Sequence, residues 1–148
     1  MSFVLPTTTD FKTMFDREFN YAAEDDASNL KKIRDTDITK AIACADVNFN
    51  ECLFGTDAKA TLAFLFLAAS FLVENLRNST NGLASQARFP IASKTVGGVT
   101  VQFQVPTRFQ ADPFVALMAG NGYGLMYLSM ALPAATGQIF ISPGGPKP

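Results

Sequence analysis

The residue types that could do chemistry in this chain are few, and the first observation is what is missing. The 148 residues contain no histidine, no tryptophan and only two cysteines. Without an imidazole there is no Ser-His-Asp or Cys-His pair and no histidine-containing zinc site. Two thiols are also too few for a multi-cysteine metal cluster. We therefore expect no catalytic residues, no cofactor and no bound metal.

One glycine-rich stretch, Gly120-Asn121-Gly122-Tyr123-Gly124, superficially resembles a phosphate-binding loop. The dinucleotide fingerprint needs a preceding strand and a different glycine spacing, whereas here a helix is predicted to precede the stretch and no lysine follows it. The pattern favours a simple break between two helices. A small-molecule pocket at this break is the alternative from a different functional class.

The cysteines and the clustered acids also favour structural roles. Cys44 and Cys52 lie eight residues apart on one predicted helix, so helical rise would separate their Cα atoms by about 12 Å. A disulfide needs less than about 7 Å, so we expect two reduced thiols in the core. Glu24-Asp25-Asp26 and Asp35-Thr36-Asp37 lack the spacing of a calcium loop. We expect the first group in a solvated loop and the second at a helix start.

Three bases, Arg88, Lys94 and Arg108, flank a predicted hairpin and are the residues best placed to touch a phosphate backbone. No aromatic side chains are interleaved with them in the pattern typical of nucleic-acid binding. The formal net charge of −1 also differs from the strongly basic face of most nucleic-acid binders. We expect no more than non-specific proximity to DNA.

Charge is distributed unevenly along the chain. Residues 1–60 carry eleven acids and seven bases, whereas residues 61–148 carry two acids and five bases. A soluble monomer usually has about a quarter to a third of its surface positions charged. The most apolar run, residues 60–73, is 14 residues long, shorter than the roughly 20 of a membrane-spanning helix, and the N-terminus has no signal-peptide pattern. We therefore expect no membrane insertion and a second half that is covered by other protein.

Hydrophobic periodicity predicts a mainly α protein, a small helical bundle. The expected helices run from Asp10 to about Phe19, from Asp35 to about Leu53, from Asp57 to about Asn78, from Pro113 to the Gly120 break, and from Tyr123 to Leu132. The second has one apolar stripe, made of Ile38, Ala41, Ile42, Ala45, Phe49, Cys52 and Leu53, with Gly55 as its C-terminal glycine.

The third predicted helix is apolar nearly all round and should therefore be the central helix. The last has no charged residue, so every face of it is expected to meet protein, and Pro133 is expected to end it. Met118, Met126 and Met130 are expected in the core.

Two segments are expected to be extended. Val99, Val101, Phe103 and Val105 alternate with polar residues, and the turn pair Gly97-Gly98 precedes them, which predicts a β-hairpin over 88–105. The chain ends in 138–148, where Ile139-Phe140-Ile141 precedes residues that suit neither helix nor strand. An exposed apolar triplet promotes aggregation, so we expect this tail to dock on a partner. The chain thus divides into a helical domain with a hairpin, 1–137, and an extended C-terminal tail, 138–148.

The order of elements carries a resemblance to a known family. Its residues are Asp10-Phe11-Lys12, Asp35-Thr36-Asp37-Ile38, Leu67-Ala68-Ala69, Ser93 to Val101, and Tyr123-Gly124-Leu125-Met126-Tyr127-Leu128. Together they are similar to the head–tail connector (adaptor) proteins of tailed bacteriophages, over roughly residues 10–137.

The resemblance implies a helical bundle with a projecting hairpin, assembled as a ring of about twelve copies beneath the portal protein. Such a ring belongs to the virion neck, is made in the host cytoplasm, extends the DNA channel and docks the next neck or tail protein. A tail-terminator or head-completion protein is the structural alternative. The residues expected to face other copies or partners are Lys94, Thr95, Val96, Gly97, Gly98, Val99, Thr100, Val101, Tyr123, Gly124, Tyr127, Ile139, Phe140 and Ile141.

Overall fold

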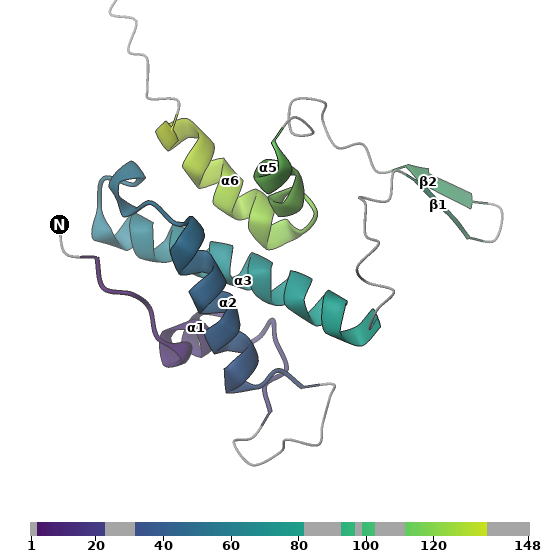
Figure 1. The fold of residues 1–148 in the computed structure, drawn as a ribbon, viewed down its shortest axis with the longest axis horizontal. Helices are drawn as coiled ribbons and strands as arrows, with labels where there is room; N and C mark the ends of the chain where they lie inside the picture. Colours follow the sequence, from purple (N-terminus) through teal and green to yellow (C-terminus); the bar gives the residue numbers. More distant parts are fainter. Residues whose placement is uncertain (1–2, 23–31, 82–92, 97–98, 103–111, 136–148) are drawn as a thin grey trace, which may run out of the picture.

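The fold is mainly helical, as the sequence predicts (Figure 1). A computed structural model describes residues 3–22, 32–81, 93–96, 99–102 and 112–135. Its elements are α1 (Thr8–Met14), α2 (Asp35–Asn48), the short 3-10 helix η1 (Glu51–Leu53), α3 (Asp57–Asn81), β1 (Ser93–Val96), β2 (Val99–Gln102), α5 (Pro113–Met118) and α6 (Gly122–Ala135).

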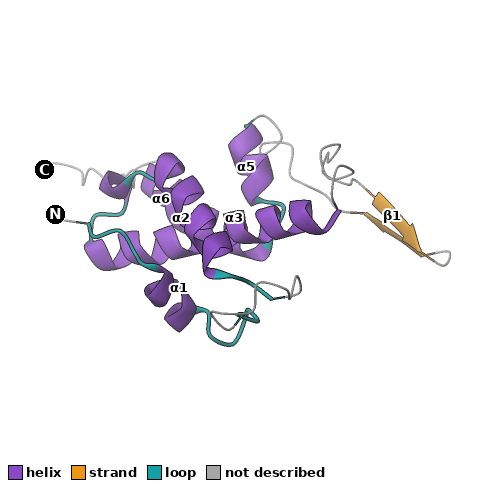
Figure 2. Ribbon diagram, turned by 60° about the horizontal axis from the view of Figure 1, so that its bottom comes forward, coloured by secondary structure: helices purple, strands orange, loops and turns teal. Residues whose placement is uncertain are grey.

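The longest helix, α3, is the centre of the bundle. Helices α2 and α6 both pack against it, and α1 packs against α2, so α3 runs through the middle in both ribbon views (Figures 1 and 2). Several of its side chains are fully buried: Ala63, Phe64, Leu67, Ala68, Ala69, Ser70 and Leu72. The prediction of a central, apolar third helix is confirmed.

Helix α3 is also the one helix of the described residues that is long and apolar enough to cross a membrane. The segment Asp57–Arg77 spans 21 residues with a mean hydropathy of 1.5, and half of its most apolar window is buried inside the subunit. The core helix of a bundle has the same length and composition, and here α2 and α6 pack on it.

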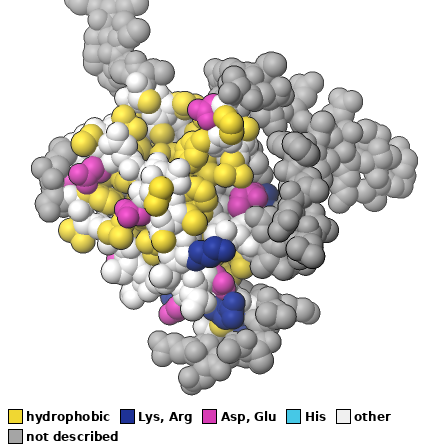
Figure 3. All heavy atoms as spheres, in the orientation of Figure 1, with side chains coloured by type: hydrophobic (Ala, Val, Ile, Leu, Met, Phe, Trp, Pro, Cys, Tyr) yellow, Lys and Arg dark blue, Asp and Glu magenta, His cyan; other side chains and the backbone are white. Residues whose placement is uncertain are grey.

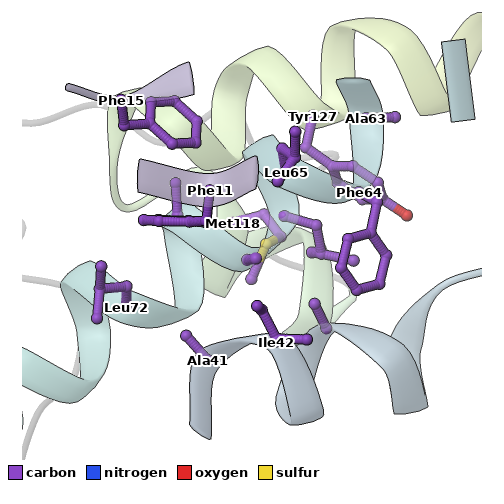
Figure 4. Packing of buried hydrophobic residues seen from close by; sticks show 14 of the residues in the cluster. Phe11, Phe15, Ala41, Ile42, Ala63, Phe64, Leu65, Leu72, Met118 and Tyr127 are labelled. Carbon is purple, nitrogen blue, oxygen red and sulfur yellow. The ribbon is translucent and has the colours of Figure 1, made fainter. Parts of the chain in front are cut away.

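The hydrophobic core joins side chains from most of the described helices. Phe11 and Phe15 come from α1 and the turn that follows it, Ile38 from α2, Met118 from α5, and Leu128 from α6. Figure 4 looks into this core, where Met118 lies among side chains from the other helices. Burial of a side chain of this size contributes about 1.5–3 kcal/mol, so the short helices α1 and α5 are held by packing more than by their own propensity.

Two helices begin at side chains that cap their first turns. The Thr56 hydroxyl accepts a hydrogen bond from the Lys59 backbone N–H at 3.4 Å at the start of α3. Asp112 Oδ1 accepts from the N–H of Phe114 at 2.9 Å and of Val115 at 3.4 Å, with Pro113 as the first residue of α5. These side chains satisfy donors that the first helical turn leaves without a partner.

The predicted limits of the first helix were wrong. Helix α1 begins at Thr8 and ends at Met14, well before Phe19. Thr7 is the N-cap, and Asp10 accepts from the Thr7 backbone N–H at 2.8 Å, so the two form a reciprocal capping box. This pairing places Asp10 inside the first turn and not at the cap.

The second helix is also shorter than predicted, because it ends at Asn48 and the separate helix η1 follows. Asn50 begins η1 by accepting from the Cys52 N–H at 3.1 Å. Cys44 and Cys52 therefore lie on different elements, and both are free thiols. Cys52 is exposed, which corrects its prediction as a core residue. Gly55 follows η1 with φ of +69°, a conformation that glycine adopts without strain.

The last helix passes through the residue that was expected to stop it. Pro133 lies inside α6, which continues to Ala135. A proline removes one backbone hydrogen bond to the residue four positions earlier. In the final turn this loss affects a single bond, so packing along the rest of α6 outweighs it.

The strands β1 and β2 pair antiparallel, with Val96 opposite Val99 and Ser93 opposite Gln102. The predicted turn at Gly97-Gly98 and the outer parts of the predicted hairpin, 88–92 and 103–105, lie outside the described residues. The complete hairpin stays a prediction.

Candidate interaction surface

The corner between α5 and α6 is held by a buried chain of polar contacts. Asn121, only 8% exposed, caps α6: its Oδ1 accepts from the Gly124 N–H at 2.8 Å. Its Nδ2 donates to the Ser70 hydroxyl of α3 at 3.0 Å, and that hydroxyl donates to the Met118 sulfur at 3.4 Å. The Asn121 amide and the Ser70 hydroxyl therefore bond to each other, and the glycine-rich break is a junction between two helices.

Gly124 lets α6 approach this corner closely. A Cβ atom at position 124 would lie 2.0 Å from the Met118 carbonyl oxygen, far inside van der Waals contact. The missing side chain therefore permits the crossing of α5 and α6. Gly122, two residues earlier, has nothing within 4 Å of the same hypothetical atom, so this constraint belongs to Gly124.

A second link ties the corner to α3 from outside. The Arg77 guanidinium donates to Glu74 at 2.9 Å and to the Gly120 carbonyl at 3.4 Å. The carbonyl belongs to the turn that follows α5, between α5 and α6. Together with Asn121, this contact fixes which face of α6 points toward α3 and which points away.

The face of α6 that points away from α3 is uncharged and largely apolar. Residues Gly124, Tyr127, Leu128 and Ala131 are buried, as expected for one helical face. The opposite face, which we call the outer face of α6, consists of Gly122, Leu125, Met126, Ser129 and Pro133. Leu125 is 49% exposed and Met126 is 52% exposed. In Figure 3 hydrophobic side chains gather over the upper part of the molecule, where Figure 1 places α6.

An acidic and aromatic patch lies near the start of α6. The ring centroid of Phe19 is 5.4 Å from that of Tyr123 and 6.4 Å from that of Tyr21. Burial and then the nearby Glu18 carboxylate raise the pKa of Tyr21 to about 12, with smaller effects from Tyr123 and Asp16. Burial and Glu18 also raise the pKa of Tyr123. The patch therefore combines half-buried rings with the carboxylates of Glu18 and Asp16, and the Lys12 Nζ lies 5.9 Å from the centroid of the Tyr21 ring.

The residues that were predicted to face partners lie in three different settings: inside the subunit, on the paired strands, and outside the described residues. Tyr127 is only 4% exposed and Gly124 lies against Met118, so both serve the packing of the subunit itself, which corrects their assignment to a partner surface. Tyr123 is half-buried against Phe15 and Phe19. The register of the strands places three predicted residue pairs opposite one another, Lys94 with Val101, Thr95 with Thr100 and Val96 with Val99. Gly97, Gly98, Ile139, Phe140 and Ile141 lie outside the described residues.

Sequence reasoning missed the residues that organise this surface. Met126 was assigned to the core, whereas it is among the most exposed large apolar side chains described. Asn121 had a recognisable signal, because an asparagine that precedes a helical segment is a preferred N-cap. Ser70 had a weaker signal, a hydroxyl within the apolar run 60–73, and its partner is 51 residues away.

Comparison of the chain with models of known families, with curated proteins and with solved structures gave no match.

Proposed function

We propose that this chain is a structural protein of the virion neck: a head–tail adaptor that assembles as a ring beneath the portal and docks the next neck or tail protein. The outer face of α6 is the observation that carries the proposal. It presents Leu125 and Met126 half exposed on a helix without a single charge. Exposed apolar faces of this kind mark contacts with other protein.

A closed ring explains such a face well. Each subunit of a ring meets its neighbours through two different surfaces, so a small subunit is covered on both sides. We assign the outer face of α6 to one neighbour. We further propose that the edges of β1 and β2 and the C-terminal segment from residue 138 onward supply contacts by strand addition to a neighbour or to the portal.

The test is the mass of the purified chain, alone and mixed with the portal protein of its virion, by mass photometry and cryo-electron microscopy. We expect a closed ring of about twelve copies bound to the portal. The double variant Leu125→Asp with Met126→Asp should lose the ring and keep its helices, because both side chains are exposed in the single subunit. Ala43→Asp on the exposed face of α2 is the matched control and should assemble normally.

A stable monomer that ignores the portal would contradict the proposal. Co-purification with a tail-tube protein in place of the portal would favour the tail-terminator alternative.

A further inference from the structure

We propose that the outer face of α6 is the docking site of the chain's own C-terminal segment, Ile139-Phe140-Ile141, in the free subunit. This inference goes beyond the proposed function and does not depend on it, because one chain in solution is enough to test it. It rests on the exposure of Leu125 and Met126, on the length of the chain that follows α6, and on charge.

The length of the tail matches the position of the exposed side chains. Phe140 is five residues beyond Ala135, the last residue of α6, so an extended chain carries it about 17 Å from the helix end. Met126 lies nine residues before Ala135, about 14 Å back along the helix axis. Gly137 stands just after the helix, and glycine at that position commonly permits the chain to reverse its direction.

The charged residues indicate which way the tail would run along α6. Lys147 is the only charged side chain after Asp112, so the tail pairs three apolar residues with one distant cation. Glu18 precedes Phe19, whose ring centroid lies 5.4 Å from that of Tyr123 near the start of α6, and Glu18 raises the pKa of both Tyr21 and Tyr123. A tail that runs back along α6 carries its apolar residues over Met126 and its cation toward this acidic and aromatic patch.

The chain's own tail is a better occupant of this face than another copy for a physical reason. A short flexible tether holds its end at an effective concentration in the millimolar range, far above that of a second chain in dilute solution. Covering Leu125 and Met126 in this way removes apolar surface from water before any assembly takes place.

The methionines of the chain provide the test, because there are five and they lie in different environments. The methyl groups are labelled with carbon-13 in the full chain, and their NMR spectrum is compared with that of Phe140→Leu. Loss of the Phe140 ring should shift the signal of Met126, Met130 or both. Met118, which is fully buried, and Met14, on α1, should keep their positions and act as internal controls.

A mixing experiment distinguishes the chain's own tail from a neighbour's. Labelled wild-type chain is diluted into excess unlabelled Phe140→Leu chain, and the Met126 and Met130 signals should stay at their wild-type positions. Their movement to the variant positions would overturn the proposal, because the tail would then come from another copy. Unchanged Met126 and Met130 signals in pure Phe140→Leu would overturn it as well. Neither result bears on ring formation, which the mass measurement tests separately.

Discussion

At the scale of single residues, Gly124 and Gly122 near the start of α6 differ in the space available for a side chain. Gly124→Ala places a methyl group 2.0 Å from the Met118 carbonyl oxygen, so either α6 or α5 must move. We expect the free energy of unfolding to fall by about 2–3 kcal/mol, measured by urea denaturation. Gly122→Ala meets open space and is the control, with an expected change of less than about 1 kcal/mol. Equal losses for the two variants would show that the close approach at Gly124 is not what requires glycine.

The tyrosine of the acidic and aromatic patch makes stability depend on alkaline pH. Burial and Glu18 raise the pKa of Tyr21 from 10.0 to about 12 in the folded chain. Below pH 10 the phenol is protonated in both states, so its full contribution to stability is present there. Between about pH 10 and 12 the unfolded chain releases the proton while the folded chain keeps it, and this contribution is lost.

The measurement is a titration of phenolate absorbance together with urea denaturation across this pH range. Tyr21→Phe should remove the highest-pH step of the absorbance curve and make the decline in stability shallower than in the wild type. An unchanged decline in Tyr21→Phe would attribute the pH dependence to other groups. The measurement also reports on Tyr123 and Tyr127, whose pKa values are raised by burial.

At the scale of elements, the junction of α3, α5 and α6 depends on one buried hydroxyl. Ser70→Ala leaves the Asn121 Nδ2 without its acceptor at 3.0 Å inside the subunit, which should cost about 1–3 kcal/mol of unfolding free energy. Ser129→Ala is the matched control on the exposed face of α6, where the hydroxyl bonds only to the Met126 carbonyl. Its expected effect is within about 0.5 kcal/mol. Similar losses for both would show that the hydroxyl of Ser70 is not required at the junction.

Element by element, local signals were predictable and distant ones were not. The starts of α5 and α3 are predictable because their capping residues, Asp112 before Pro113 and Thr56, are close in sequence to the backbone groups that they bond. The central position of α3 is predictable because this helix is apolar on nearly all sides. The end of α2 at Asn48 could not be seen, because its apolar stripe continues at helical spacing into η1.

Only part of the outer face of α6 could be predicted, because its chemistry is local in the sequence and its orientation depends on distant residues. The absence of charge from α6 indicates contact with protein, but periodicity does not tell which side of an uncharged helix faces α3. That orientation comes from Asn121 and Ser70, which are far apart in sequence, and from the close approach at Gly124. Tyr127 therefore belongs to the core and Met126 to the surface, the reverse of their predicted places.

At the scale of the whole molecule, the uneven charge and the outer face of α6 have one explanation. The last 88 residues contain only seven charged residues, fewer than the surface of a soluble monomer usually carries, and within the described part α6 contributes none of them. In the free subunit the tail is proposed to cover this face, and in a ring the neighbour is proposed to replace it. We propose that the tail, once displaced from α6, binds the portal.

Deletion of residues 138–148 should therefore have two opposite effects. Self-association of the free chain should strengthen by about tenfold, because the outer face of α6 loses its cover, and docking to the portal should weaken, because the apolar triplet is gone. Circular dichroism should show the same helices, since the described core residues lie outside the tail. Deletion of 142–148 alone retains Ile139-Phe140-Ile141 and is the matched control, with both measures close to wild type. Weaker self-association in the longer deletion would instead identify the tail as a tether between copies, and unchanged docking would show that it does not reach the portal.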